Sequence, residues 1–317
     1  MPTQFLRQEP IDLNPSHKVS TGDASLYDQK GMSKRFSVIC VKACFWVGSD
    51  RGKRMRYQKG SVALNNRQDR AILSFVADSR YITHSQLFDF TWIDHQGFNR
   101  RVFNWRIRRL VRSGLVRKQV LPFLNGEALY SISRGGIQAL EQLGVYYLGG
   151  NLDREKDAHE AQVPHALEVN NIRLVLLRTG IIWSWIPESF IRVLNLSPAS
   201  AYAKVYDGIA RIRLGADYID FAVEYERTLK TPSKYRKIRE AIESEKRLHA
   251  FLYLVPTYDL RFNLIHEFHG TRRLVFFGLI SEFKRKALAA EVWAANYCGT
   301  SLQGALEQVG VLAKSRE

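Results

Sequence analysis

Cysteine is scarce in this sequence, and long apolar runs are absent. Three cysteines occur in 317 residues, and this low, odd number argues for a reducing compartment rather than a disulfide framework. Cys40 and Cys44 have no second Cys/His pair nearby, which disfavours a zinc site. No run of about 18 or more apolar residues occurs, and the first residues lack a basic-then-apolar signal pattern. We therefore expect a cytoplasmic protein that does not associate with membranes.

Acidic residues are few relative to basic ones. The chain has 47 Lys and Arg against 31 Asp and Glu, a formal net charge of +16, whereas its 45% of hydrophobic residues is average. Residues 1–150 hold 23 basic and 11 acidic side chains, so this half carries 23 − 11 = +12. The length predicts about two domains of roughly 150 residues each. Positive charge concentrated in one of them predicts a polyanionic partner, and we expect double-stranded DNA.

Residues 66–148 follow the order of elements that is typical of a winged helix. Helical spacing of apolar residues around positions 72–76 and 87–88 predicts two helices, and a basic helix follows over 98–115. Residues 115–121 and 128–132 have the pattern of two strands, with the Asn125-Gly126 turn between them. This order predicts a winged helix-turn-helix DNA-binding domain, preceded by a flexible basic arm over 1–65.

Basic side chains dominate the third helix and the first strand of the hairpin. Between positions 100 and 118 there are eight Lys or Arg residues and no acidic residue, whereas an ordinary solvated helix interleaves Glu. This pattern favours contacts with phosphates. The alternative is a winged helix that binds protein, with its arginines in solvent. The predicted DNA-binding residues are Arg100, Arg101, Arg106, Arg108, Arg109, Arg112, Arg117 and Lys118.

The second half of the chain predicts an α/β domain over 164–286. A polar segment without periodicity over 149–163 indicates a linker. The apolar patterns after it predict a helix at 165–177, three strands that end near position 226, a helix at 233–248, and strands at 251–255 and 273–279. We expect residues 287–317 to form a C-terminal helical tail.

Three carboxylates are spaced so that this domain would bring them together. Glu224 and Glu226 lie two apart in one predicted strand and therefore share a face. A hairpin that turns at Gly215 places Asp207 beside them, and the three charges repel one another unless a divalent cation, an arginine or a lysine neutralises them. Lys230 is the candidate lysine. The alternative is a set of ordinary surface carboxylates on an edge strand.

The arrangement of these carboxylates resembles the metal-dependent nucleases of the restriction-endonuclease superfamily, whose signature is an Asp in one strand and an acid-x-Lys pair in the next. The resemblance implies a restriction-endonuclease-like α/β domain of the PD-(D/E)xK type that holds Mg²⁺ or Mn²⁺, with Glu168 of the first helix as an accessory ligand. Tyr206 stands in place of the usual Pro, and Glu226 in place of the usual Lys. The implied catalytic residues are Asp207, Glu224, Glu226 and Lys230.

Motifs from both halves together resemble the replication-relaxation family of plasmid and mobile-element proteins, and more distantly the relaxases built on the restriction-endonuclease fold. The resemblance rests on RRLVRSGLVRK, YSISRGGIQAL, HALEVNNIRLVLL and EYERTLK, and it covers about residues 66–280. It implies a protein that nicks or relaxes DNA at an origin-like site with a divalent metal, and it allows other replication or mobilisation proteins as partners. The alternative is a non-catalytic winged-helix regulator or replication accessory protein with a degenerate nuclease fold.

Overall fold

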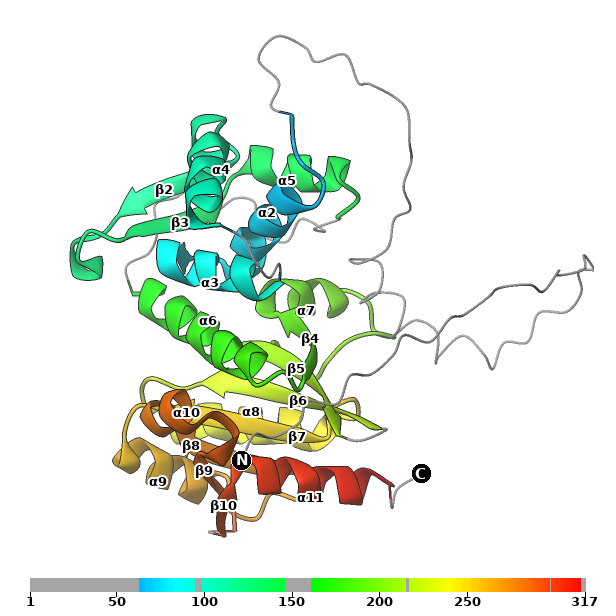
Figure 1. The fold of residues 1–317 in the computed structure, drawn as a ribbon. Coiled ribbons are helices and arrows are strands. Elements are labelled where there is room, and N and C mark those ends of the chain that lie inside the picture. The colour runs from blue at the N-terminus through cyan, green and yellow to red at the C-terminus, as the bar shows by residue number, and fades with distance from the viewer. Residues whose placement is uncertain (1–62, 95–98, 146–160, 215–216, 297, 315–317) are drawn as a thin grey trace, which may run out of the picture. The chain divides into compact units, whose positions relative to one another are not determined.

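The computed structural model describes residues 63–94, 99–145, 161–214, 217–296 and 298–314 (Figure 1). All of them belong to one compact unit, residues 52–317. The predicted basic arm lies outside the described residues except for positions 63–65, and the predicted linker over 149–163 does so except for positions 161–163, the last of which begins α6. The pair Cys40 and Cys44 also lies outside them, whereas Cys298 is an exposed free cysteine.

The N-terminal part, residues 63–145, consists of helices packed on a small sheet. The sheet has the strand order β1-β3-β2, and both pairings are antiparallel. The 3-10 helix Pro122–Leu124 lies in the connection between β2 and β3. The elements of this part, in chain order, are α2 (Gln68–Ser79), β1 (Ile82–Thr83), α3 (His84–Asp94), α4 (Arg100–Arg112), β2 (Val116–Val120), β3 (Ala128–Ile132) and α5 (Arg134–Gln142).

Helix α4 shows how the local sequence determines an element in this part. The Asn99 side chain accepts a hydrogen bond from the Arg101 N–H at 2.8 Å and so caps the helix at its first turn. Phe103, Ile107 and Leu110 recur at helical spacing and are buried, and they join the core that α2, α3 and α5 build. The helix therefore has one apolar face in the core and one strongly basic face.

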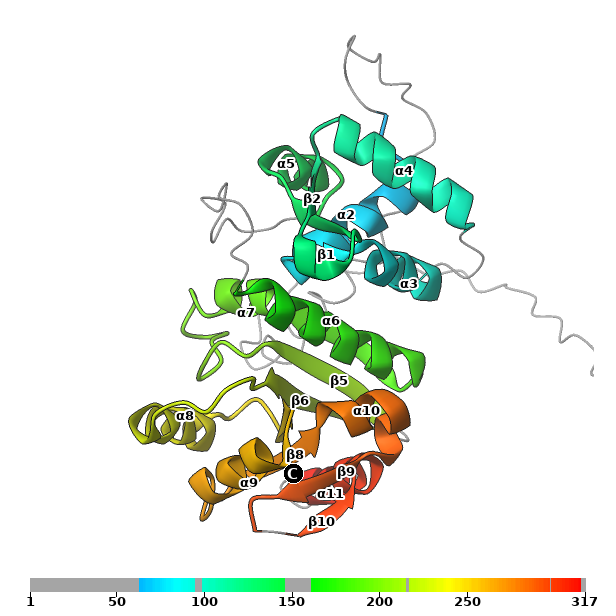
Figure 2. The same ribbon diagram turned by 90° about the vertical axis from the view of Figure 1, so that its left-hand side faces the viewer.

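The C-terminal part is a mixed α/β structure with a seven-stranded sheet of order β10-β9-β8-β7-β6-β5-β4 (Figures 1 and 2). Strands β4, β5 and β6 are antiparallel, β6, β7 and β8 are parallel, and β8, β9 and β10 are antiparallel. The strands are β4 (Ile182–Pro187), β5 (Gly208–Leu214), β6 (Asp217–Tyr225), β7 (Ala250–Val255), β8 (Leu274–Leu279), β9 (Glu291–Ala294) and β10 (Gly299–Ser301).

Helices cover both faces of this sheet. Apolar side chains of α6, α10 and α11 pack on one face, in a core that includes Ile172, Phe283 and Leu306. Side chains of α7, α8 and α9 pack on the other face, in a second core that includes Tyr235 and Leu264. The helices are α6 (Val163–Arg178), α7 (Glu188–Leu194), α8 (Pro232–Ser244), α9 (Tyr258–Glu267), α10 (Ile280–Lys286), the 3-10 helix Ala287–Ala289, and α11 (Leu302–Lys314).

The expected helical tail over 287–317 is wrong in part. This segment contributes strands β9 and β10 to the sheet, and only α11 is an α-helix. Val292 of β9 pairs with Gly278 of β8 and is fully buried, as is Ala305 of α11. The two strands are three and four residues long, which is too short for a period-2 pattern to stand out in the sequence.

Helix α6 joins the N-terminal part to the sheet. Its Leu174 belongs to the core of the N-terminal part, whereas its Ile172 packs on the sheet. The buried Asn170 side chain donates a hydrogen bond to the Tyr81 carbonyl oxygen at 2.8 Å, and the Gln86 side chain donates one to the Asn171 side chain at 2.7 Å. Because these buried polar groups make hydrogen bonds across the junction, the two parts pack as one body along α6.

Candidate functional site

The carboxylates of Asp207 and Glu224 face each other across two neighbouring strands. In the antiparallel pairing of β5 and β6, Gly208 lies opposite Val223, so Asp207, just before β5, lies opposite Glu224. The Tyr225 N–H donates a hydrogen bond to Asp207 Oδ2 at 2.8 Å. Side chains directly opposite on one face of a sheet are close neighbours. The hairpin therefore brings these two carboxylates together at the end of the strands.

Glu226 lies one residue beyond the end of β6. Its N–H donates to the Leu254 carbonyl oxygen at 3.0 Å, which extends the pairing with β7, and the residue is 6% exposed. It shares a sheet face with Glu224, because side chains two apart on extended backbone point the same way. Each of the two glutamates has its own lysine, since Lys204 pairs with Glu224 and Lys230 pairs with Glu226.

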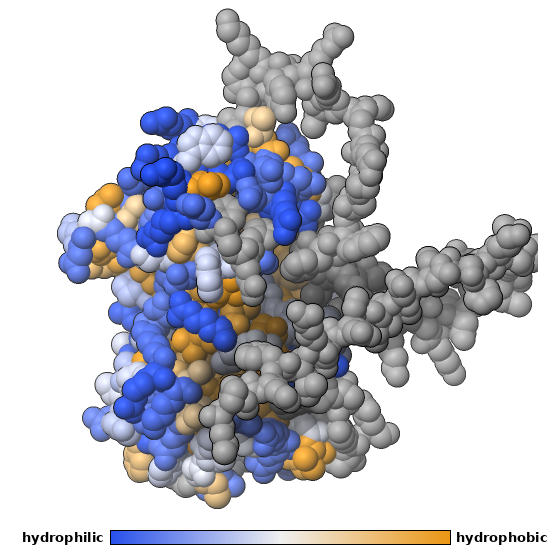
Figure 3. Space-filling view, in the orientation of Figure 1, coloured by the Kyte–Doolittle hydropathy of each residue, from blue (hydrophilic) through white to orange (hydrophobic). Residues whose placement is uncertain are grey.

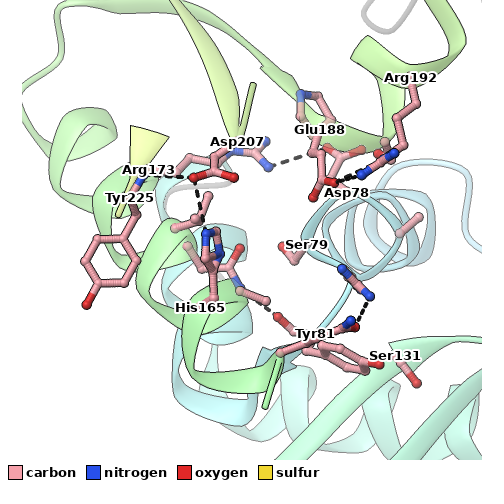
Figure 4. A pocket seen from close by; sticks show the side chains of 18 of the residues that line it. Asp78, Ser79, Tyr81, Ser131, His165, Arg173, Glu188, Arg192, Asp207 and Tyr225 are labelled. Carbon is pink, nitrogen blue, oxygen red and sulfur yellow. Dashed lines mark hydrogen bonds and ion pairs between the residues drawn. The ribbon is translucent and has the colours of Figure 1, made fainter. Parts of the chain in front are cut away.

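A histidine completes the surroundings of Asp207. His165 Nε2, from the first turn of α6, lies 3.3 Å from Asp207 Oδ2. Figure 4 shows the His165 ring pointing at this carboxylate. Burial lowers the pKa of His165 below its usual range, which favours the neutral imidazole. A neutral imidazole makes this contact a polar one rather than an ion pair.

The electrostatics of the site are dominated by burial and by repulsion between acids. Burial, followed by the charge of Glu224, raises the pKa of Asp207 well above its usual range. Burial also raises the pKa of Glu226, against the opposing effect of Lys230. Tyr253 of β7 lies beside Glu224 in the sheet, is 1% exposed, and its hydroxyl has no hydrogen-bond partner within the described residues. Three carboxylates stand against two lysines at this site, so keeping all three ionised in a buried position costs free energy.

The predicted ligand set of Asp207, Glu224, Glu226 and Glu168 is not assembled. Glu168 belongs to α6, which covers the opposite sheet face from the two glutamates, and it pairs with Lys284 of α10 at 2.5 Å. In the described part of the chain, no three His, Cys, Asp or Glu side chains are placed as a metal-binding group. The charge of Glu224 acts on both Asp207 and Glu226, and each glutamate is paired with a lysine.

Sequence reasoning missed two of the residues that contact these carboxylates. Lys204 stands three residues before Asp207, in the segment that precedes β5. His165 precedes Glu168 by three residues on α6 and occupies the position that was assigned to Glu168. A lysine before the Asp and a histidine on the first helix were visible in the sequence, but neither belongs to the expected acid-x-Lys pattern.

A cavity of about 770 Å³ opens between the N-terminal part and the carboxylate end of the sheet. Its walls come from the end of α2, the β2–β3 hairpin, α6, α7 and the segment 224–230 (Figure 4). Acidic lining residues include the carboxylates described above and Glu188. The basic lining residues are Arg80, Arg117, Arg134, Arg173, Arg192, Arg227 and Lys230. Acids thus line several walls of the cavity, and three of its cations, Arg173, Arg192 and Lys230, pair with the lining acids Asp78, Glu188 and Glu226.

The eight predicted DNA-binding residues divide into three groups. Arg106 and Arg109 both pair with the fully buried Asp69 of α2, whose single negative charge offsets part of their two positive charges. Arg117 is half-buried and lines the cavity. The exposed group, which Figure 3 shows as a strongly hydrophilic region over α4, contains Arg100, Arg101, Arg108, Arg112 and Lys118.

An exposed indole lies among these cations. Trp105 of α4 is 56% exposed, and the guanidinium groups of Arg106 and Arg109 lie 5.7 and 5.1 Å from the centre of its ring. The indole thus lies beside two arginines that pair with Asp69. This face of α4 presents positive charge and one exposed aromatic ring to solvent.

Comparisons with known proteins give one weak likeness. No protein-family model matches the chain, and no curated protein matches it. Among solved structures, the chain is similar to the restriction endonuclease FokI bound to DNA, with 12% identity and a TM-score of 0.23. The likeness covers 68% of this chain and 43% of that one, so the chain spans less than half of that protein. No helix in the described ranges is long and apolar enough to cross a bilayer.

Proposed function

We propose that this protein is a metal-dependent DNA-nicking enzyme, with a winged-helix domain that binds duplex DNA and a restriction-endonuclease-like domain that cleaves one strand. The observation that carries the proposal is the Asp207–Glu224 pair at the end of a cavity with cationic walls. Paired carboxylates are needed to bind a hard divalent cation, and cationic walls are needed to bind a phosphodiester backbone. The motif resemblance extends the proposal to an origin-like site of a plasmid or mobile element.

The order of elements supports the assignment of the second domain. Helix α6 is followed by the antiparallel strands β4, β5 and β6, then by α8 and the parallel strand β7. Asp207 stands at the start of the second strand and Glu224 near the end of the third, as the signature of the superfamily requires. The departure is at Glu226, where the signature has a lysine.

The first half supports duplex binding by α4. Helices α2, α3 and α4 precede the β2–β3 hairpin, in the order of a winged helix. The exposed Arg101, Arg108 and Arg112 lie on α4, which has no acidic residue. Such a face gains affinity by releasing counterions from DNA.

The donor set at the carboxylates fits Mg²⁺ or Mn²⁺. Asp207 and Glu224 offer oxygen ligands, their mutual repulsion calls for a cation, and the Tyr253 hydroxyl beside them has no partner in the described structure. A bound divalent cation supplies polarisation of the phosphodiester and a lowered pKa of an attacking water. Lys204 forms an ion pair with Glu224, so it would compete with a metal ion for this carboxylate. We assign the stabilisation of charge on the phosphate to Lys230, which lines the cavity and pairs with Glu226.

Nicking of supercoiled DNA tests the chemistry. Glu224→Gln should abolish nicking that depends on Mg²⁺ or Mn²⁺ and leave DNA binding intact, because a neutral amide is a poor ligand for a hard cation. The matched control is Glu240→Gln, an exposed residue of α8, which should nick like the wild type. A wild-type protein that neither binds the cation in calorimetry nor nicks DNA would contradict the catalytic proposal.

Salt dependence tests duplex binding. Replacing Arg101, Arg108 and Arg112 with Ala should weaken binding to any duplex and reduce the log–log salt slope by about 0.9 for each lost phosphate contact. Replacing Arg236 and Lys237, exposed cations of α8, is the control and should leave the slope unchanged. An unchanged slope in the triple variant would assign the α4 arginines to solvent or to a protein partner.

A second candidate function is a non-catalytic DNA-binding regulator or replication accessory protein. The observation that favours it is the pairing of Glu224 with Lys204 and of Glu226 with Lys230, which neutralises both glutamates without a metal. In that case Mg²⁺ should not stabilise the protein, whereas a true site raises the unfolding temperature as the cation concentration rises above the dissociation constant. Thermal unfolding with and without Mg²⁺ separates the two functions.

A further inference from the structure

The β2–β3 hairpin faces the carboxylates, whereas no exposed arginine of α4 lines their cavity. Arg117 and Gln119 of β2, Ser131 of β3 and Arg134 of α5 line one wall of the cavity. The segment after β6, with Arg227 and Lys230, lines it as well and carries Glu226 at its beginning. Two cations of the N-terminal part and two of the sheet domain thus border one space that leads to Asp207 and Glu224.

The packing of the N-terminal part along α6 fixes the walls of the cavity relative to one another. Asn170 and Gln86 make their hydrogen bonds across the junction, and Arg173 pairs with Asp78 of α2 at 3.5 Å. Polar contacts along α6 therefore position the hairpin relative to the carboxylates. A ligand that fills the cavity contacts both the hairpin and the carboxylates.

The size of the cavity restricts what enters it. Its volume of about 770 Å³ lies within the range of small-ligand pockets, roughly 300 to 1,000 Å³. A base-paired duplex is wider than its own major groove, which measures about 12 Å across in B-DNA. It is therefore too large for a space of this volume. An unpaired strand is thin enough, and single strands are typically held by a cationic groove that follows the backbone and by aromatic rings that stack on bases.

We propose that this cavity binds a short unpaired segment of DNA, with its phosphates between Arg117 and Arg134 on one side and Arg227 and Lys230 on the other. Two aromatic residues of the lining, Tyr225 and His165, have ring centres 5.7 Å apart, and one base would lie against this pair. The proposal rests on the proposed function and deepens it, because it makes the substrate a melted site next to a duplex that α4 binds.

Binding to three labelled DNAs tests this assignment by fluorescence anisotropy. They are a single strand, the matched duplex, and the same duplex with an unpaired central bubble, all without divalent cation so that nothing is cleaved. The wild type should bind the bubble more tightly than the duplex. The variants Arg117→Gln/Arg134→Gln and Arg227→Gln/Lys230→Gln should each weaken single-strand and bubble binding by roughly tenfold or more, and should reduce the single-strand salt slope by about 1.4. Binding to the duplex should be unchanged.

The controls separate this inference from the proposed cleavage. Replacing Arg101, Arg108 and Arg112 with Ala should weaken duplex binding and leave single-strand binding unchanged. The assignment is wrong if both cavity variants bind the single strand like the wild type. It is also wrong if they lose as much affinity for the duplex as for the single strand, or if the wild type binds none of the three DNAs. If the protein never nicks DNA but the cavity variants bind the bubble less tightly than the wild type, the proposed cleavage is refuted and the binding of unpaired DNA stands.

Discussion

Removing the charge of Asp69 should destabilise the N-terminal part strongly. The Asp69 side chain is fully buried and accepts hydrogen bonds from Arg106 at 2.9 Å, from Arg109, and from the Asn65 N–H at 2.6 Å. Asp69→Asn keeps the shape of the side chain but leaves two guanidinium groups without a counter-charge. Their side chains are 13% and 25% exposed, so neither group is free to hydrate fully.

The magnitude follows from this burial. Breaking a buried pair by removing one partner costs about 3–5 kcal/mol, because the remaining charge is left uncompensated. The partial exposure of Arg109 lets water replace part of the lost interaction, so we expect about 3 kcal/mol. For a chain of this size each 1 kcal/mol lowers the unfolding temperature by roughly 2–4 °C, which predicts a decrease of roughly 6–12 °C.

Thermal and urea unfolding measure this effect. The matched control is Asp89→Asn, which also removes an Asp–Arg pair, since Asp89 contacts Arg178 at 2.7 Å. Those side chains are 39% and 56% exposed, and surface pairs contribute about 1 kcal/mol or less. If Asp69→Asn unfolds within about 1 kcal/mol of the wild type, or no earlier than Asp89→Asn, the buried charge does not stabilise this domain and the reasoning fails.

Three further predictions concern a glycine, a histidine and two lysines. Gly136→Ala should destabilise by about 1–3 kcal/mol in urea unfolding, because its Cβ would overlap a backbone carbonyl oxygen, whereas Gly135→Ala meets nothing closer than 3.6 Å and should be neutral. Burial lowers the pKa of His84, so stability should fall as the pH decreases below about 6.5, where the unfolded chain takes up the proton first; His84→Gln should flatten this decrease between pH 7.5 and 5.5. Lys230→Met should slow nicking on the order of a hundredfold with little change in cation affinity. If Lys204→Met slows nicking instead and Lys230→Met does not, the phosphate-stabilising lysine is Lys204.

The local elements of this protein were predictable from the sequence. The apolar spacing of Phe103, Ile107 and Leu110 indicated α4, and the apolar run before Glu224 indicated β6. The spacing of 17 positions from Asp207 to Glu224, together with the predicted turn at Gly215, was enough to align them, since the register of a tight hairpin follows from its turn. These features depend on neighbours along the chain, and short-range periodicity encodes them.

Only the tertiary structure decided which charges meet. Arg106 and Arg101 look alike in the sequence, yet the first pairs with Asp69 and the second is exposed, because the packing of α4 on α2 places one of them over a buried acid. Likewise α6 brings His165 rather than Glu168 to Asp207. The rotation of a helix about its axis selects the side chains that reach another element, and that rotation is set by the packing of whole cores rather than by spacing along the chain.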